Sequence, residues 1–147
     1  MAELHTQLNK DCYLLGRFSL CRLLLARDSN YPWFILVPDR ENITEIYQLT
    51  ELDRSQLLLE SSLLAEFLVE SFAADKLNIA ALGNLVPQLH LHHVVRYQTD
   101  PAWPAPIWGK CAATAYDDRS LAALWSRFAS ADLPGLAVAE YNPGSLP

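Results

Sequence analysis

The strongest constraint on the fold of this chain is a helical pattern that covers residues 52–72 and contains neither glycine nor proline. Its apolar side chains recur at spacings of three, four and seven residues, which places them on one stripe of an α-helix. The stripe is formed by Leu57, Leu63, Leu64, Phe67 and Leu68. The pattern therefore predicts one long helix that buries this stripe against another element.

The start and the outer side of this helix can also be predicted. Thr50 followed by Asp53 resembles a capping box, in which the hydroxyl accepts an early helical N–H and the carboxylate suits the positive end of the helix dipole. We therefore expect the helix to begin beside Thr50. Glu60, Glu66 and Glu70 fall largely off the apolar stripe, so we expect them on a solvated face.

Two apolar segments before the helix predict a pair of β-strands. Residues 20–26 are rich in leucine and lead into the turn-prone sequence Asp28-Ser29-Asn30. Residues 33–37 form an unbroken apolar run that ends at Pro38. The connection between them is shorter than the dozen or so residues that a parallel crossover needs, so we expect antiparallel pairing.

Two further strands are expected after the helix. Residues 76–82 carry apolar side chains on one parity, and Gly83-Asn84 supplies a turn. Residues 88–97 begin with an alternation of polar and apolar side chains, as in a strand with two unlike faces. The pattern predicts a second antiparallel pair.

The rest of the chain suggests a loop, a helix and a tail. Residues 100–109 hold three prolines and two tryptophans, which predicts an ordered, irregular loop packed on another part of the protein. Its segment 103–108 is expected either to cover the site or to make a hydrophobic or dimer contact. Residues 120–129 predict a short helix after Asp117-Asp118, and the segment from Leu133 to Pro147 is expected to be irregular.

Length, charge and composition limit the class of protein. The 147 residues suit one domain, expected to span 1–147, and 51% hydrophobic against 19% charged residues exclude a disordered chain. Eleven Lys and Arg against seventeen Asp and Glu give a net charge of −6, which disfavours a nucleic-acid polymer as partner. The three cysteines form no disulfide or zinc motif, and without a secretory or membrane-spanning segment we expect a cytoplasmic protein.

A row of polar side chains is the one feature that predicts chemistry. If residues 88–92 are a strand, Gln88, His90 and His92 share one face, and the leucines between them face the other way. Neighbours on one face lie roughly 6 to 7 Å apart, so a single phosphate group can touch two of them. A neutral imidazole can attack through one nitrogen while the other donates a hydrogen bond that fixes the tautomer.

Two other interpretations of these histidines remain open. A metal site formed by His90, His92 and His93 would need all three rings to converge, and His93 has the parity of the core. The histidines can also simply fill a half-exposed sheet face. We expect no metal and no cofactor, and we expect His93 to be a buried histidine with satisfied hydrogen bonds.

The chain resembles the histidine triad (HIT) family of nucleotide hydrolases and transferases. The family motif is His-φ-His-φ-His-φ-φ, where φ is apolar, and residues 88–94 read Gln-Leu-His-Leu-His-His-Val. Residues 34–38 resemble the family's apolar strand that ends in proline, and the long helix follows in the same order. The resemblance covers about residues 15–109 and leaves 110–147 as a C-terminal extension.

This resemblance implies three catalytic positions. The family's nucleophile, which attacks an α-phosphorus to form a nucleotidyl-histidine, falls on His90, and the third motif histidine, which contacts phosphate oxygens or the departing group, falls on His92. The first motif position is Gln88, whose amide hydrogen-bonds but cannot hold a proton near neutral pH. Trp33 stands where many relatives carry a further histidine.

The resemblance also implies nucleotide-binding positions. Asn78 and Asn84 correspond, with a difference of one residue in length, to the family's phosphate-binding Asn and Gln. Asp28 corresponds to the carboxylate that holds the ribose hydroxyls in relatives. Its other interpretation is a turn residue that stabilises Ser29-Asn30.

Together these observations predict an α+β, HIT-like fold, with an antiparallel sheet of about five strands, one long helix and an added C-terminal helix. The resemblance implies a homodimer that acts on a small nucleotide, such as a dinucleoside polyphosphate or a nucleoside phosphoramidate. The alternative is a nucleotide-binding or sensory module of the same fold with little or no turnover.

Overall fold

The computed structural model describes residues 1–143, which form one antiparallel sheet and the helices that cover it. The strands are β1 (Cys12–Arg17), β2 (Cys21–Ala26), β3 (Trp33–Pro38), β4 (Lys76–Ala80), β5 (Leu91–Arg96) and β6 (Ala137–Val138). Their order across the sheet is β4-β5-β3-β2-β1-β6. The helices are α1 (Thr6–Asp11), the short 3-10 helix η1 (Ile46–Gln48), α2 (Glu51–Phe72) and α3 (Asp118–Ala131). The predicted α+β architecture is confirmed.

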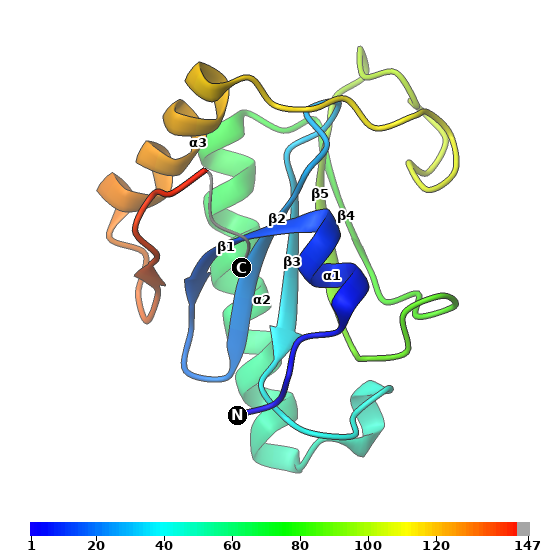
Figure 1. Cartoon of the computed structure of the whole chain (residues 1–147), viewed down its shortest axis with the longest axis vertical. Coiled ribbons are helices and arrows are strands. Elements are labelled where there is room, and N and C mark those ends of the chain that lie inside the picture. The colour runs from blue at the N-terminus through cyan, green and yellow to red at the C-terminus, as the bar shows by residue number, and fades with distance from the viewer. Residues whose placement is uncertain (144–147) are drawn as a thin grey trace.

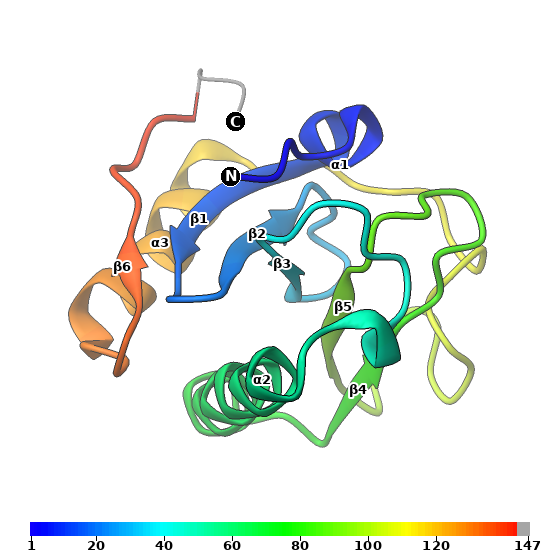
Figure 2. The same cartoon turned by 90° about the horizontal axis from the view of Figure 1, so that it is seen from below.

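The helices form layers on both faces of the sheet, with α1 on the opposite side from α2 (Figures 1 and 2). The larger core joins Leu64 and Leu68 of α2 and Phe128 of α3 to alternate side chains of the strands. A smaller cluster packs Leu8 of α1 against Ile35 and its neighbours on the other face. Within residues 1–143, no helix is both long and apolar enough to cross a bilayer.

The long helix begins where the sequence predicts. The Thr50 hydroxyl accepts the backbone N–H of Asp53 at 3.1 Å, which satisfies one of the free donors of the first turn. The helix ends at Ala73, which adopts the left-handed conformation with φ of 49°. The predicted helix over residues 52–72 is therefore confirmed to within one residue.

The expectation that all three glutamates of this helix are solvated is wrong for Glu60. Glu66 and Glu70 are exposed, but Glu60 is only 1% exposed. Its carboxylate accepts the backbone N–H groups of Leu20, at 3.1 Å, and Cys21, at 2.8 Å. Since the β1–β2 turn leaves these donors unpaired, the buried carboxylate satisfies them and joins the helix to the hairpin.

The strand pairing follows the predicted pattern in the centre of the sheet. β2 and β3 pair antiparallel, with Leu23 opposite Leu36 and Leu25 opposite Phe34. β5 then pairs antiparallel with β3 on one side and with β4 on the other. β5 is buried along its whole length, so the histidine-rich segment lies inside the protein and not at a sheet edge.

The C-terminal segment is more regular than predicted. Ala137 and Val138 form β6, which pairs antiparallel with Arg17 and Gly16 of β1, so the expectation of an irregular tail is wrong at these residues. A Cβ on Gly16 would lie 2.7 Å from the carbonyl oxygen of Ala137, so only glycine allows this close approach. The rest of the predicted tail includes residues 144–147, which lie outside the described residues.

The proline-rich loop and the last helix agree with the sequence predictions. α3 begins after Asp117, whose carboxylate accepts the N–H of Ser120 at 2.7 Å. Ala102 and Ile107 of the loop are buried in a third cluster with Tyr31 and Val94. The loop is therefore packed against the face of the sheet that α1 also covers.

Candidate active site

β5 presents its side chains to two different environments. Leu91, His93 and Val95 face the helix α2, where the leucine and the valine belong to the main core. His92 faces the other side, opposite Ile35 of β3. The strand begins at Leu91, so the expectation of a strand from residue 88 is wrong in its first residues.

His90 and His92 nevertheless lie side by side, as their spacing predicts. Their ring centroids are 4.9 Å apart, and the planes are inclined by 71°. Leu89, between Gln88 and His90, is buried in the main core, so the alternation of sides extends beyond the strand itself. The two imidazoles are 7% and 5% exposed, respectively. Two neighbouring imidazoles therefore lie together in a largely buried environment.

The tautomer of His90 follows from its hydrogen bond. Nδ1 lies 2.7 Å from the backbone carbonyl oxygen of Gln88. A carbonyl oxygen only accepts, so Nδ1 must carry the hydrogen and donate it. In the neutral ring the lone pair is then on Nε2, which is the form that an imidazole needs in order to attack an electrophile.

His92 has the opposite tautomer. The indole Nε1 of Trp33 lies 2.9 Å from its Nδ1. An indole N–H only donates, so Nδ1 of His92 accepts and Nε2 carries the hydrogen. The pair therefore offers one nucleophilic nitrogen on His90 and one N–H donor on His92.

The surroundings of His92 keep it uncharged. Burial, together with the neighbouring imidazoles of His90 and His93, lowers the pKa of His92 from 6.5 to about 3. The indole rings of Trp33 and Trp108 flank it, with centroids 5.7 Å and 5.2 Å from that of the imidazole. Near neutral pH the ring is therefore neutral and carries its one N–H on Nε2.

His93 lies apart from this pair, on the opposite face of the strand. Its Nδ1 is 3.1 Å from the carbonyl oxygen of Leu91, and its Nε2 is 2.7 Å from the hydroxyl of Ser61 on α2. It is 0% exposed, which confirms the prediction of a buried, hydrogen-bonded histidine. The three rings do not converge on one point, and residues 1–143 contain no group of three His, Cys, Asp or Glu side chains placed to hold a metal ion.

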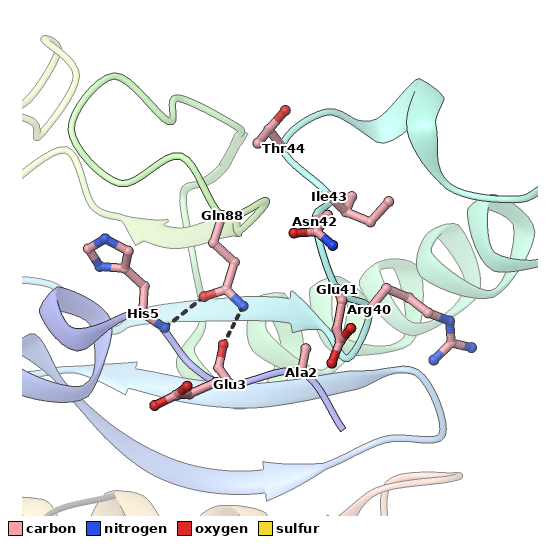
Figure 3. Close-up of a pocket in the computed structure, with 9 residues that line it drawn as sticks. All are labelled: Ala2, Glu3, His5, Arg40, Glu41, Asn42, Ile43, Thr44 and Gln88. Atoms are coloured by element: carbon pink, nitrogen blue, oxygen red, sulfur yellow. Dashed lines mark hydrogen bonds between the residues drawn. The ribbon is translucent and has the colours of Figure 1, made fainter.

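The side chain of Gln88 contacts the N-terminal segment. Its Oε1 accepts the backbone N–H of His5 at 2.8 Å, and its Nε2 donates to the carbonyl oxygen of Glu3 at 3.1 Å (Figure 3). Gln88 also lines a cavity of about 390 Å³ together with residues 40–44 and the N-terminal segment. Neither His90 nor His92 lines this cavity. The backbone carbonyl of Gln88 accepts a hydrogen bond from His90, whereas its side-chain amide binds the N-terminal segment.

The residues expected to bind the nucleotide are spread around the fold. Asp28 accepts the backbone N–H groups of Asn30, at 3.0 Å, and Thr114, at 3.2 Å, so it does stabilise its own turn. Asn78 on β4 accepts a hydrogen bond from Arg96 at 2.7 Å. Asn84 is exposed in the turn region after β4. The structure brings His90 and His92 together, and it engages the oxygens of Asp28 and Asn78 in contacts within the protein.

Sequence reasoning missed how the proline-rich loop is held in place. Arg96, only 2% exposed, forms an ion pair with Asp100 at 2.8 Å and donates to the carbonyl oxygen of Ala105 at 2.8 Å. Burial raises the pKa of the Asp100 carboxyl, but the hydrogen bonds from Arg96 and from backbone N–H groups outweigh it and lower the pKa. The only signal in the sequence is an arginine at the end of a strand and an aspartate four residues later.

Comparison with known proteins gives one family. A family model described as the HIT domain matches residues 7–99. No curated protein matches the chain. A solved histidine triad protein from Marinobacter aquaeolei VT8 is 48% identical with a TM-score of 0.88, and the match covers 93% of this chain and 99% of that one.

Two other solved structures agree with this result. A histidine triad protein from Bradyrhizobium japonicum is 42% identical, with a TM-score of 0.85 and coverage of 86% of this chain and 95% of that one. A histidine triad protein from Sinorhizobium meliloti 1021 is 38% identical, with a TM-score of 0.84 and coverage of 86% and 94%. The similarity therefore extends over nearly the whole of each solved chain.

Proposed function

Because this chain belongs to the histidine triad family, we propose that it is a nucleotide hydrolase or nucleotidyl transferase that forms a covalent nucleotidyl intermediate on His90. The observation that carries the proposal is the pairing of opposite tautomers, with a lone pair on Nε2 of His90 beside an N–H on Nε2 of His92. The substrate class is a small nucleotide, such as a dinucleoside polyphosphate or a nucleoside phosphoramidate.

The proposed reaction has two steps. First, Nε2 of His90 attacks the α-phosphorus, a phosphorus–nitrogen bond forms, and the bond to the leaving group breaks with its electron pair going to that group. The Nδ1 hydrogen stays on His90 and is stabilised by the Gln88 carbonyl oxygen. Second, water attacks the phosphorus, the electron pair returns to Nε2, and a water proton passes to the solvent. A second nucleophile in place of water gives transfer.

The proposed role of His92 is to stabilise charge. The Nε2–H of His92 donates a hydrogen bond to the phosphate or leaving-group oxygens, on which negative charge develops during the reaction. Such a donor is worth more in this buried environment than in water, because water no longer competes for the oxygen. Both rings are more than nine-tenths covered, so we also propose that Trp108 moves aside when a nucleotide enters.

The nucleotide-binding assignments remain part of the proposal. Asp28 would hold the ribose hydroxyls, and Asn78 and Asn84 would contact phosphate oxygens, as in the family. Asp28 and Asn78 would have to exchange contacts with Thr114 and Arg96, respectively, for contacts with the ligand. Substituting each by alanine should therefore raise KM more than it lowers kcat.

The covalent step is tested by trapping the intermediate. We expect brief incubation with diadenosine tetraphosphate to add one nucleotidyl group to the protein, and acid to remove it. His90→Asn, which keeps a polar side chain of similar shape, should lose the adduct and at least about 10³-fold of the rate. An unchanged rate in a variant whose circular dichroism matches that of the wild type would exclude His90 as the nucleophile.

A nucleotide-binding module without turnover is the second candidate function. It is favoured by Gln88, which replaces a titratable side chain and whose amide is engaged by Glu3 and His5. Under this alternative, a mononucleotide raises the melting temperature by mass action, but neither product nor adduct forms over many hours. Product formation that depends on His90 rules the alternative out.

A second copy of the chain is the proposed protein partner. The outer face of α2 exposes several large apolar side chains, including Leu52 at 83%, Leu58 at 69% and Leu59 at 52%. Leu85, after the edge strand β4, is 95% exposed. Exposed apolar surface of this kind is typical of an interaction face, and the family resemblance favours a homodimer as its occupant.

A further inference from the structure

We infer that Trp33 determines which bond this site cleaves: by fixing His92 as a neutral donor, it restricts the enzyme to leaving groups that depart as anions and excludes amines. The inference rests on the proposed function and names its substrate class. It favours phosphoanhydrides, such as dinucleoside polyphosphates, over nucleoside phosphoramidates. Trp33 is in this sense a positioning residue, because it acts through His92 and not on the substrate.

Trp33 is held in place by the sheet and by its neighbours. It is the first residue of β3, opposite Val94 of β5. Its ring contacts two apolar clusters, and it meets Trp108 edge to face with centroids 6.3 Å apart. With its backbone in the sheet and its ring packed on several sides, the indole N–H is directed at His92 before any substrate arrives.

The hydrogen bond from Trp33 opposes protonation of His92 at Nδ1. A proton added to Nδ1 would point at the indole N–H, and two donors would then face each other. The other titratable groups that act on His92 are the imidazoles of His90 and His93, and each disfavours a further positive charge. Burial and these two imidazoles lower the pKa of His92 to about 3, and no carboxylate of residues 1–143 is among the groups that shift it.

The other motif positions supply no acid. His90 is the nucleophile, and its Nδ1 hydrogen is donated to the carbonyl oxygen of Gln88. The Gln88 side chain is an amide, which does not release a proton near neutral pH, and it is bonded to the N-terminal segment. The three motif positions therefore supply a lone pair and a neutral N–H, but no group that gives up a proton.

The chemistry of the leaving group decides which substrates a site without an acid can cleave. When the bond between the α-phosphorus and a bridging oxygen breaks, the oxygen keeps the electron pair, and the phosphate leaves as an anion that the His92 N–H stabilises. When a phosphorus–nitrogen bond breaks, the nitrogen must gain a proton to leave as an amine. General acids contribute about 10²–10⁴-fold to such steps. A site without one should therefore discriminate against phosphoramidates by at least about 10²-fold.

The kinetic test compares two substrates with the same nucleotide. We expect kcat/KM of the wild type to be at least about 10²-fold higher for diadenosine tetraphosphate than for an N-alkyl phosphoramidate of AMP, in which the alkylamine is linked to phosphorus through nitrogen. Trp33→Phe keeps a ring in the cluster but removes the N–H, and Trp33→His places a side chain there that can hold a proton. Trp33→His should lower this ratio at least about tenfold, because the new side chain can protonate the amine. Trp33→Phe should lower it less, because burial and the neighbouring imidazoles still disfavour protonation of His92.

The spectroscopic test does not depend on turnover. Two-dimensional ¹⁵N-¹H spectra of the histidine side chains should show His92 with its hydrogen on Nε2 in the wild type. Trp33→Phe should give a mixture of tautomers and a His92 that takes up a proton at higher pH. Trp108→Phe is the matched control, because the indole nitrogen of Trp108 is buried without a partner among the described residues, and its loss should leave the tautomer unchanged.

The outcomes separate this inference from the function on which it rests. If the nucleotidyl adduct forms on His90 but phosphoramidates react as fast as anhydrides, the proposed function stands and the role of Trp33 is wrong. If no nucleotide reacts, the proposed function fails, and the tautomer of His92 in the two tryptophan variants still tests the structural part. A tautomer that is unchanged in Trp33→Phe overturns the inference in either case.

Discussion

The hydroxyl of Ser61, on the long helix, lies 2.7 Å from Nε2 of His93 in the centre of the sheet. The Nδ1 of the same ring is 3.1 Å from the carbonyl oxygen of Leu91, so Nδ1 carries the hydrogen and Nε2 accepts from the serine. Burial lowers the pKa of His93 from 6.5 to about 4, although the backbone hydrogen bond opposes this shift. The contact joins two layers of the fold through a neutral imidazole.

Acid should therefore destabilise the protein partly through His93. Between about pH 6.5 and about pH 4 the unfolded chain binds a proton at this residue and the folded chain does not, so the free energy of unfolding falls as the pH falls. From about pH 7 to about pH 5 the loss is about 2 kcal/mol for this residue. Urea unfolding of His93→Gln at both pH values should show a loss smaller by that amount. Equal losses in variant and wild type would contradict the assignment.

Glu60 should be essential to the β1–β2 hairpin, although it is a glutamate on a helix. Glu60→Ala leaves the N–H groups of Leu20 and Cys21 without their acceptor in a buried position. We expect a loss of about 2–4 kcal/mol in the free energy of unfolding. Glu66→Ala on the exposed side of the same helix is the control and should change it by less than about 0.5 kcal/mol. Similar values for the two variants would disprove the role of Glu60.

The ion pair between Arg96 and Asp100 should hold the proline-rich loop. The two side chains are 2% and 3% exposed, so Asp100→Ala leaves a buried guanidinium without its charge partner. We expect a loss of about 3–5 kcal/mol in stability. Hydrogen exchange should show faster opening of residues 101–109 than in the wild type. Unchanged exchange in this loop would show that other contacts hold it.

The proposed homodimer is tested by placing a charge on its expected face. Leu58→Glu, on the outer side of α2, should weaken self-association, because a carboxylate buried in an apolar interface has no partner. Light scattering after size-exclusion chromatography should then give the mass of one chain, against two for the wild type. Ala123→Glu on the exposed side of α3 adds the same charge elsewhere and should leave the dimer intact. A wild type that is monomeric over a wide concentration range would exclude the dimer.

Patterns within single segments predict much of this fold. The helix α2, the pairing of β2 with β3 and the helix α3 are visible because apolar spacing and capping residues act over a few neighbours. The strands β1 and β6 do not give such a signal. β6 has only two residues, and its pairing depends on Gly16, a contact between distant parts of the chain.

In the candidate site, too, some features can be predicted from the sequence and others depend on the fold. The two-residue spacing of His90 and His92 is enough to predict that their rings are neighbours, because backbone geometry alternates side chains between two sides. The tautomer of His92, by contrast, depends on a partner that the spacing does not reveal. Trp33 is 59 positions away from His92 in the chain, and Ser61 is 32 positions away from His93.

Patterns among neighbouring residues thus predict the family, the main elements and the two histidines that we propose to react, since each depends on residues close together in sequence. The packing of β3 against β5 brings the indole of Trp33 to His92 and fixes the tautomer of His92, and the packing of α2 against the hairpin buries Glu60. The physical reason is that a hydrogen-bond donor fixes a tautomer, or satisfies a buried charge, only when folding has brought it within about 3 Å.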